Sequence, residues 1–244
     1  MTYDDARLAA LYDTDNPDGP DHDFFRRYVR ESGARRIVDL GCGTGILTVT
    51  LTAPGRSVVG IDPAAAMLEV AQGRPGGEDV QWVQGTSDQI APGSADLVLM
   101  TGNVAMHLIG DTWTRTLTDV AAGLTPGGRL LFDARNPDAR AWRHWQDPGT
   151  ERDTPVGRLR ESATTGSPDP DGVVRMQFVN EFLDTGDRLD GELVLQFRSH
   201  AQIEADLRAA GLRPLNVWRD WNQTPFTGGA DQHLMVVEAA SPRR

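Results

Sequence analysis

The feature that most constrains the fold is a glycine-rich segment, VDLGCGTG at positions 38–45, which joins a short apolar run to a helical pattern. Gly41, Gly43 and Gly45 permit positive φ angles and a close approach of a ligand to the backbone. The dinucleotide fingerprint needs a further glycine where Ile46 stands, and GxxxxGK[ST] does not occur. We therefore expect a ligand without a pyrophosphate, with Asp39 either ordering the loop or facing a cationic amino group through water.

The surrounding chain alternates between predicted strands and predicted helices. Short apolar runs bounded by Gly, Pro or Asp lie at 36–40, 57–61, 80–83, 95–100 and 129–132, and helical patterns lie at 45–52, 64–72 and 112–123. This alternation predicts a doubly wound α/β domain with a parallel sheet. A ligand of such a domain binds beyond the carboxyl ends of the strands, beside the first one.

The pattern changes in the second half of the chain. Between about 155 and 198, apolar residues alternate by twos and turn signals separate the segments, which predicts a small antiparallel β insertion. A capped helix from 199 to about 210 follows, and strands at 213–218 and 233–239 close the sheet as an antiparallel pair. We expect an N-terminal helical lid at 1–35, a binding domain at 36–139 and 199–244, and an insertion over the active site at 140–198.

Composition excludes several classes of protein. The formal net charge is −11, from 24 Lys and Arg against 35 Asp and Glu, so no nucleic-acid partner is expected. A single cysteine, Cys42, makes no intrachain disulfide, and the five histidines lack metal-ligand spacing, so no metal is expected. The N-terminus lacks the features of a signal peptide, and no apolar run reaches about 18 residues, so we expect a cytoplasmic protein without membrane contact.

A second polar position follows the second predicted strand. Asp62, in the sequence Gly60-Ile61-Asp62-Pro63, lies 21 residues after Gly41. A carboxylate there accepts two hydrogen bonds from a ribose diol. The alternative is that Asp62 caps the helix that Pro63 begins. The glycine loop beside it favours the diol.

These motifs resemble those of class I S-adenosylmethionine-dependent methyltransferases. VDLGCGTG matches the first motif of that family, GIDPAAAMLEVAQ the second, and LTPGGRLLF the segment after the core. The resemblance spans about 36–133 and extends through the C-terminal elements to about 239. It implies a Rossmann-like seven-stranded sheet of order 3-2-1-4-5-7-6 with helices on both faces, S-adenosylmethionine as the cofactor and S-adenosylhomocysteine as the product.

The resemblance also assigns side chains to the cofactor. The glycine loop would contact its methionine part, and Asp62 its ribose hydroxyls. Met67 would pack on the adenine ring, while Thr86 and Ser87 would meet the polar edge of that ring, although the family more often has an acid at the position of Thr86. Tyr12 would cover the cofactor, with a packing role as the alternative, and Thr101, after the fourth strand, completes the expected cofactor site.

The acceptor chemistry is expected after the fourth strand, where residues 101–108 read TGNVAMHL. Nucleic-acid methyltransferases that act on amines typically show [DN]PP[YF] there, and its absence agrees with the negative charge. His107 is a candidate general base because an unperturbed imidazole has a pKa near 6.5. Sugar N-methyltransferases of antibiotic pathways have a similar segment that ends in His-Leu. The alternative is that His107 orders the loop or positions the acceptor.

Further residues are expected at the acceptor because they follow strands at the ligand end. They are Asn103, Arg135, Trp142 and Trp221. Arg135 would pair with an acidic group of the acceptor or, alternatively, with a surface carboxylate. Trp221 would form a wall of the pocket or pack in the core.

The sequence thus predicts methyl transfer to a nitrogen or oxygen of a small molecule by in-line displacement, in secondary metabolism, by a monomer or homodimer. An amine is the preferred acceptor. The alternatives are a C-methyltransferase, a cofactor-binding or regulatory module without turnover, and a nucleotide-dependent oxidoreductase. The missing glycine of the dinucleotide fingerprint is evidence against the oxidoreductase.

Overall fold

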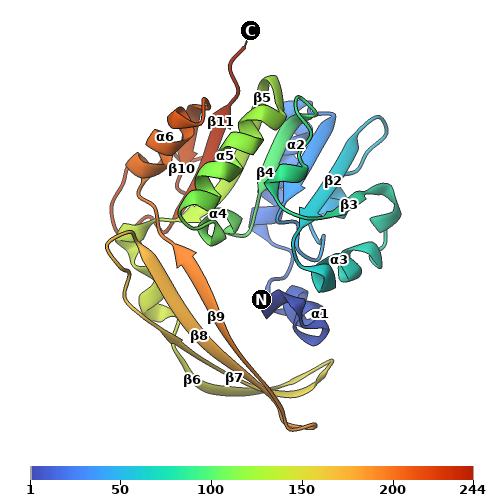
Figure 1. Ribbon diagram of the computed structural model, residues 1–244, viewed down its shortest axis with the longest axis vertical. Coiled ribbons are helices and arrows are strands. Elements are labelled where there is room, and N and C mark those ends of the chain that lie inside the picture. The colour runs from blue at the N-terminus through green and yellow to red at the C-terminus, as the bar shows by residue number, and fades with distance from the viewer. Residues whose placement is uncertain (1, 244) are drawn as a thin grey trace.

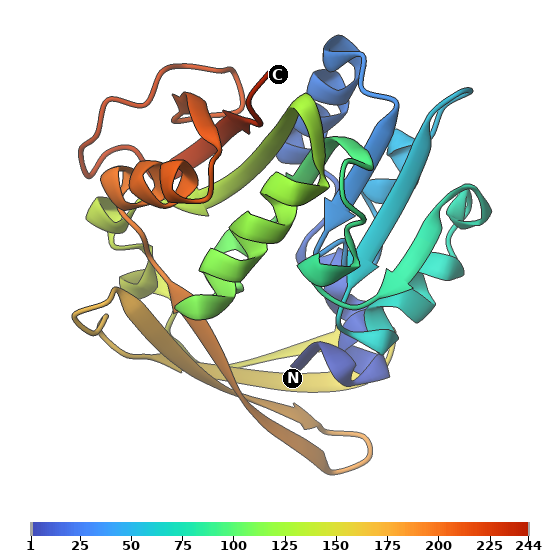
Figure 2. The same ribbon diagram turned by 45° about the horizontal axis from the view of Figure 1, so that its top comes forward.

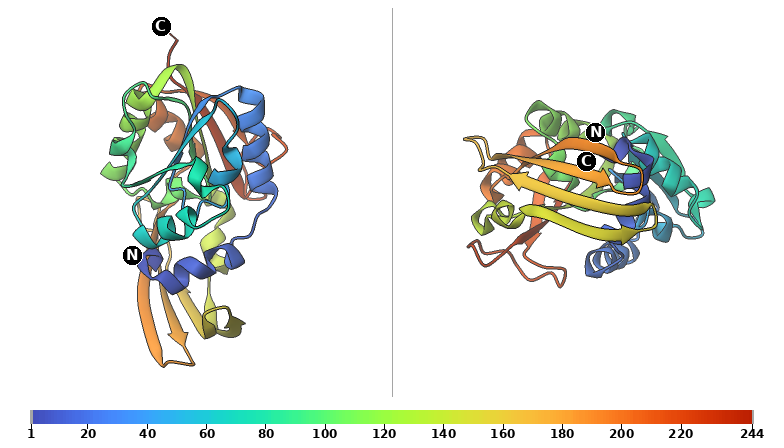
Figure 3. Two further views of the ribbon diagram at one scale, coloured as in Figure 1. Left: turned by 90° about the vertical axis from the view of Figure 1, so that its right-hand side faces the viewer. Right: turned by 90° about the horizontal axis from the view of Figure 1, so that it is seen from below.

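The computed structural model describes residues 2–243 and contains two β-sheets (Figure 1). A seven-stranded sheet with helices on both faces forms the larger part (Figure 2). A four-stranded antiparallel sheet lies beyond one end of its strands, and α1 (Ala6–Asp15) lies between the two (Figures 1 and 3).

The large sheet has the order β10-β11-β5-β4-β1-β2-β3, which confirms the order predicted from the sequence. Strands β1 to β5 are parallel to one another, and β11 runs antiparallel to both β5 and β10. The bounds are β1 Arg36–Leu40, β2 Ser57–Asp62, β3 Gln81–Gln84, β4 Ala95–Met100, β5 Leu124–Arg135, β10 Arg213–Trp218 and β11 Leu234–Ala240. The carboxyl ends of β1, β2, β4 and β5 therefore meet at one edge, where a ligand of such a sheet binds.

Helices bury apolar side chains on both faces of this sheet. On one face, Trp113 of α5 packs edge-on against Phe132 of β5. On the other, Phe24 and Phe25 of α2 join a buried cluster with Leu131. The remaining bounds are α2 Pro20–Ser32, α3 Ala65–Gln72, α4 Val104–His107, α5 Asp111–Gly123 and α6 His200–Ala209. Within residues 2–243, no helix has the length and apolar character needed to cross a membrane.

The helix predicted over 45–52 is shorter and of a different kind. A 3₁₀ helix at Thr48–Leu51 replaces it, and Gly45 has a φ of 71°. Left-handed backbone at Gly45 is incompatible with a helix that begins there. The following run of β-branched residues also disfavours an α-helix, and the Thr50 hydroxyl donates to the Leu47 carbonyl.

The second sheet consists of β6 Asp147–Thr154, β7 Gly157–Thr165, β8 Val173–Phe182 and β9 Asp187–Gln196, in that order. All three strand pairs are antiparallel. Leu159 and Phe182 of this sheet form a small buried cluster with Leu11 of α1. The alternation seen in the sequence thus produces a sheet with one face towards α1 and the large sheet and one face towards solvent.

Candidate functional site

The glycine loop follows β1 at the carboxyl edge of the large sheet. Gly41, Gly43 and Gly45 have φ angles of 77°, 54° and 71°. A Cβ atom at Gly41 would lie 2.5 Å from the Val104 side chain, and one at Gly45 would lie 2.6 Å from Trp82. Nothing lies within 4 Å of a Cβ atom built at Gly43. The outer two glycines therefore permit close packing, whereas Gly43 faces open space that a ligand can occupy.

Asp62, the last residue of β2, is joined to this loop. Its Oδ2 accepts a hydrogen bond of 2.9 Å from the Gly43 amide, and its Oδ1 accepts one of 2.9 Å from the Ala64 amide. The side chain is 8% exposed, and this burial raises its pKa. The diol role predicted for Asp62 is compatible with this geometry, because each carboxylate oxygen retains a lone pair for a hydroxyl donor. The capping role is not, because α3 (Ala65–Gln72) has Ala64 as its N-cap and no side-chain capping bond.

Asp39 lies beneath the same loop and is fully enclosed. Its Oδ2 accepts a hydrogen bond of 2.6 Å from the Thr48 hydroxyl, while its Oδ1 has no hydrogen-bond partner among residues 2–243. Burial raises the pKa of Asp39 to about 6. A carboxylate in such a position gains from a nearby cation or hydrogen-bond donor.

Asp133, near the carboxyl end of β5, was not identified from the sequence. Its Oδ2 accepts a hydrogen bond of 2.9 Å from the Asn103 amide, and burial raises its pKa to about 7. Asn103 has a φ of 65°, so the carboxylate holds a left-handed residue directly after β4. The sequence feature that could have revealed it is a single aspartate within the otherwise apolar segment LLFDA at 130–134.

Three buried side-chain oxygens without a partner in the described chain lie at this one edge. They are Oδ1 of Asp39, Asn103 and Asp133, which follow or end β1, β4 and β5. Buried polar atoms are nearly always satisfied in folded proteins. The two buried carboxylates at this edge therefore favour a cationic ligand nearby through their charge, and S-adenosylmethionine carries an ammonium group and a sulfonium.

The other residues predicted for the cofactor are distributed around this edge. Met67 is 2% exposed and belongs to a cluster with Ala9 and Tyr12. Ser87 is buried and donates a 2.7 Å hydrogen bond to Asp119, whereas Thr86 is exposed and bonds to Asp88. Thr101, which directly follows β4, is partly exposed.

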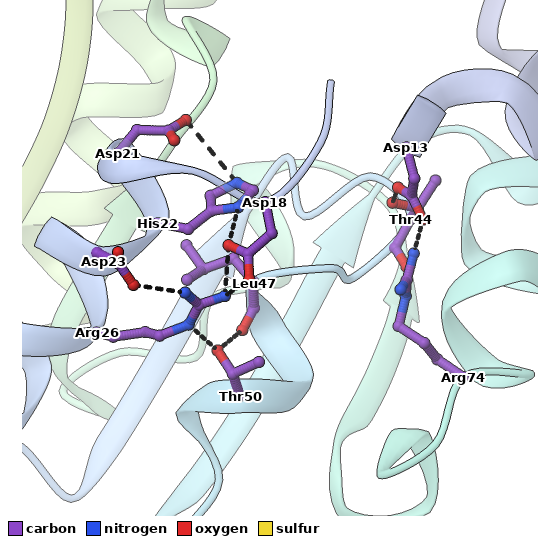
Figure 4. Close-up of polar contacts among 10 residues, drawn as sticks. All are labelled: Asp13, Asp18, Asp21, His22, Asp23, Arg26, Thr44, Leu47, Thr50 and Arg74. Carbon is purple, nitrogen blue, oxygen red and sulfur yellow. Dashed lines mark hydrogen bonds and ion pairs between the residues drawn. The ribbon is translucent and has the colours of Figure 1, made fainter. Parts of the chain in front are cut away.

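Polar contacts join α1 to both sheets. Figure 4 shows Asp13 of α1 in contact with the Thr44 hydroxyl of the glycine loop and with Arg74. Towards the second sheet, Arg7 pairs with Asp187 at 2.8 Å, and Asp15 pairs with Arg152 at 2.8 Å. The first helix is therefore held across the space between the two sheets.

The chain after α1 is fixed to the large domain by a second cluster in Figure 4. Arg26 of α2 donates to Asp18 at 2.7 Å and to the Thr50 hydroxyl at 2.9 Å. His22 Nδ1 lies 2.9 Å from Asp18. These contacts hold the start of α2 against the 3₁₀ helix that follows the glycine loop.

A cavity of about 830 Å³ lies between α1, the β4 and β5 ends and the second sheet. On the side of the large sheet it is lined by Gly102, Asn103, Met106, His107 and Arg135. Three of the residues predicted for acceptor chemistry therefore lie in one wall. On the side of α1 it is lined by Leu8, Leu11 and Tyr12, together with Tyr3 from the turn before that helix. This volume suits a small organic molecule.

His107 ends α4 and faces this cavity. Its ring lies 6.3 Å from that of Tyr3, centroid to centroid, and burial lowers its pKa. Among residues 2–243, no side chain or backbone group hydrogen-bonds to the imidazole. The ring is therefore neutral at physiological pH, with a lone pair that is available to a ligand.

Trp142 and Trp221 are not among the residues that line this cavity, so Trp142 differs from the prediction and Trp221 follows the alternative of packing. Trp142 is buried and packs edge-on against Phe197 at 4.7 Å between ring centroids. Trp221 packs against Phe24 and Phe25 of α2, at 5.5 and 5.8 Å. Both indoles thus have apolar partners in the core, which their positions after β5 and β10 did not reveal. Within residues 2–243, no cluster of His, Cys, Asp and Glu is arranged to hold a metal ion.

Part of the large domain is similar to known methyltransferases. Residues 37–128 match the family described as "Methyltransferase domain". A cypemycin N-terminal methyltransferase from a Streptomyces species is 27% identical over 216 residues, which are 86% of this chain and 85% of that protein. The chain spans about half the length of the glycine N-methyltransferases among its curated relatives.

Solved structures of methyltransferases share the fold over nearly the whole chain. The CcbJ methyltransferase from Streptomyces caelestis has a TM-score of 0.76 at 22% identity, covering 99% of this chain and 98% of that one. CalS10, an amino pentose methyltransferase from Micromonospora echinaspora with S-adenosylmethionine bound, has a TM-score of 0.64 at 20% identity, with coverage of 95% and 94%. The resemblance drawn from the sequence motifs is thereby confirmed.

Proposed function

The chain carries an S-adenosylmethionine-dependent methyltransferase domain of class I, and on that premise we propose that it methylates a nitrogen or oxygen atom of a small molecule. The observation that carries this proposal is the cavity of about 830 Å³, because Asn103, His107 and Arg135 line it at the same edge of the large sheet where the glycine loop leaves β1. The cofactor and the acceptor then occupy neighbouring compartments.

The cofactor compartment is built from the loop and the ends of β1 and β2. Gly43 leaves room for the ligand, and Asp62 accepts hydrogen bonds from the ribose hydroxyls. Met67 packs on the adenine ring with Thr86 and Ser87 at its polar edge, and Thr101 adds a cofactor contact after β4. Asp39 favours a cationic amino group. Tyr12 and the rest of α1 cover the site as a lid. When bound, S-adenosylmethionine supplies an activated methyl group on its sulfonium.

The acceptor compartment orients the nucleophile and receives its proton. Asn103 lines it at the β4 end, and Arg135 offers a guanidinium at the β5 end. His107, neutral because burial lowers its pKa, accepts the proton that an ammonium or hydroxyl acceptor loses. The second sheet covers this space on the side opposite the β4 and β5 ends, so a bound acceptor is held close to the methyl carbon, which favours in-line displacement.

An amine is the preferred acceptor, with a hydroxyl second and carbon third. The charged cavity-lining side chains are three carboxylates, Asp15, Asp147 and Glu161, and two guanidiniums, Arg135 and Arg152. This excess of negative charge favours a cationic amine over an anionic acceptor. The name of the full-length relative, an N-terminal methyltransferase, supports nitrogen as well.

Calorimetric titration with S-adenosylhomocysteine tests the cofactor assignment. We expect one site per chain with a dissociation constant in the submillimolar range, and the Asp62→Ala variant is expected to bind at least about tenfold more weakly because hydrogen bonds to a buried carboxylate are lost. A wild-type protein that gives no binding heat at submillimolar ligand, while its melting curve shows a folded chain, overturns the proposal. A parallel titration with a nicotinamide dinucleotide is expected to give no heat.

A further inference from the structure

The cavity face of the second sheet is divided into an apolar half and a polar half. Met176, Phe178, Leu193 and Leu195 on β8 and β9 line the cavity. On β6 and β7 the lining residues are instead Asp147, Thr150, Arg152, Glu161, Ser162 and Ala163. Neighbouring strands thus present side chains of opposite character to the same space.

The charged side chains of the polar half pair with one another, whereas the apolar half is only partly covered by the protein. Arg152 pairs with Glu161 at 2.6 Å and with Asp15 of α1 at 2.8 Å. By contrast, the Leu193 and Phe178 side chains are only partly buried by the protein. Apolar surface that faces a cavity gains free energy when an apolar ligand covers it.

Asn180 of β8 marks the boundary between the halves. Register pairs it with Glu161 on one side and with Leu189 on the other. It lines the cavity and is 6% exposed, and within residues 2–243 its carboxamide has no hydrogen-bond partner. Its amide atoms are not among the sealed polar atoms of the described chain, so they are open to the cavity, where a hydrogen-bonding atom of a ligand can contact them.

A glycine opposite Phe178 makes room for its ring. Phe178 and Gly191 are directly paired across β8 and β9. A Cβ atom at Gly191 would lie 2.0 Å from the Cζ atom of Phe178, so the ring lies over the glycine while it also lines the cavity. Ala163, the partner of Phe178 on β7, is also small. The sheet thereby keeps both an apolar surface and open volume above the β4 and β5 ends.

We propose that the acceptor is an amine attached to an amphipathic body larger than a single amino acid. Its apolar part packs on Phe178, Leu193 and their neighbours, and a hydrogen-bonding group of its body contacts Asn180. The inference rests on the proposed function, since it describes the acceptor of that methyl transfer. A cavity of about 830 Å³ is near the upper end of the range for small-molecule sites.

The test compares two probes that differ only in apolar length. Methyl and octyl glycosides of 2-amino-2-deoxyglucose share one amine and one sugar ring. Both are titrated by calorimetry, below the micellar concentration of the octyl compound, into the full chain saturated with S-adenosylhomocysteine. We expect the octyl glycoside to bind at least about tenfold more tightly, because several methylenes leave water. Equal affinities for the two probes overturn the inference.

Matched variants test whether the tighter binding of the octyl glycoside comes from the cavity face of the second sheet. Leu193→Asn, on the cavity face of β9, is expected to remove most of the octyl advantage, and Val194→Asn, the neighbouring residue outside the cavity lining, is expected to retain it. Asn180→Leu is expected to weaken binding of both glycosides by about fivefold to tenfold, because a hydrogen bond is lost. An octyl advantage that persists in Leu193→Asn, or falls equally in Val194→Asn, contradicts the assignment.

Binding of S-adenosylhomocysteine distinguishes the two levels of failure. If the wild-type chain and all three variants bind it with similar affinity but show no alkyl preference, the inference about the acceptor fails and the methyltransferase function stands. If the folded wild-type chain does not bind it, the proposed function itself fails.

Discussion

The cofactor end of the large sheet and the second sheet are built by different means. At the cofactor end, backbone geometry dominates, since the Gly41 and Cys42 amides both donate to the Ile61 carbonyl, at 2.7 and 3.1 Å. In the second sheet, the alternation of side chains between the two faces of each strand dominates. Its outer face carries exposed ion pairs such as Arg188 with Glu181, and its inner face carries the cavity lining. Side chains of the second sheet can therefore vary without changing the backbone that holds the cofactor.

His107 lies where the two regions meet, and its replacement has the largest expected effect. We expect His107→Ala to lower kcat by roughly 10² to 10⁴ if the imidazole removes a proton, with little change in affinity for S-adenosylhomocysteine. His107→Gln, which keeps a polar side chain, is the control for a positioning role. Steady-state rates across pH decide between them, and a kcat that stays at the wild-type value and profile in His107→Ala excludes the base.

Asp133 tests the stability cost of the cofactor edge. Its pKa of about 7 in the folded chain lies above the usual value for an aspartate. The free energy of unfolding therefore falls as the pH rises from about 4 to 7, by a total of order 4 kcal/mol. Asp133→Asn keeps an oxygen for the Asn103 amide and is expected to melt several degrees higher than wild type at pH 8. The difference should vanish near pH 4. A melting temperature below that of wild type at pH 8 contradicts this account.

Asp62 tests whether the two regions are independent. Asp62→Asn retains the shape of the side chain but weakens acceptance from the Gly43 amide and from a ribose diol. We expect a loss of affinity for S-adenosylhomocysteine of about tenfold to a hundredfold, as for hydrogen bonds to a charged group. Calorimetry measures it, and Glu161→Gln in the second sheet is the control that should change this affinity by less than about twofold. Similar losses in both variants contradict the independence.

The smallest effect is expected at the contact between α1 and the second sheet. Arg152→Ala removes the pairs with Asp15 and Glu161, which are all partly exposed, so unfolding free energy should fall by about 1 kcal/mol or less. Arg158→Ala on the outer side, which loses a more exposed pair with Glu151, is the control and should cost less. Thermal melts at low and high salt measure both. A loss of several kcal/mol in Arg152→Ala indicates that α1 is essential to the fold.

The regions also differ in how far the sequence predicts them. Strands 36–40, 95–100 and 213–218 were predicted with the bounds that the structure has, because apolar runs between turn residues determine buried strands locally. The 45–52 segment was mistaken for an α-helix because its glycine spacing resembles a helix start. In the structure Gly45 has a positive φ, and Trp82, from a distant strand, lies where its Cβ atom would be.

Side-chain environments were harder to predict than elements. The sequence placed Asn103, His107 and Arg135 at the ligand end, and they share the cavity wall. Trp142 and Trp221 follow strands in the same way, but tertiary partners bury them elsewhere. The roles of buried polar residues such as Asp133 and Asn180 depend on contacts between distant strands, which no local pattern contains.

A crystal structure with S-adenosylhomocysteine bound is the most direct test of the central claim that the two compartments adjoin. The account predicts the ribose at the Asp62 carboxylate and the sulfur facing the cavity that Asn103 and His107 line. Density that places the sulfur away from this cavity, or the nucleoside at a site remote from the glycine loop, would contradict it.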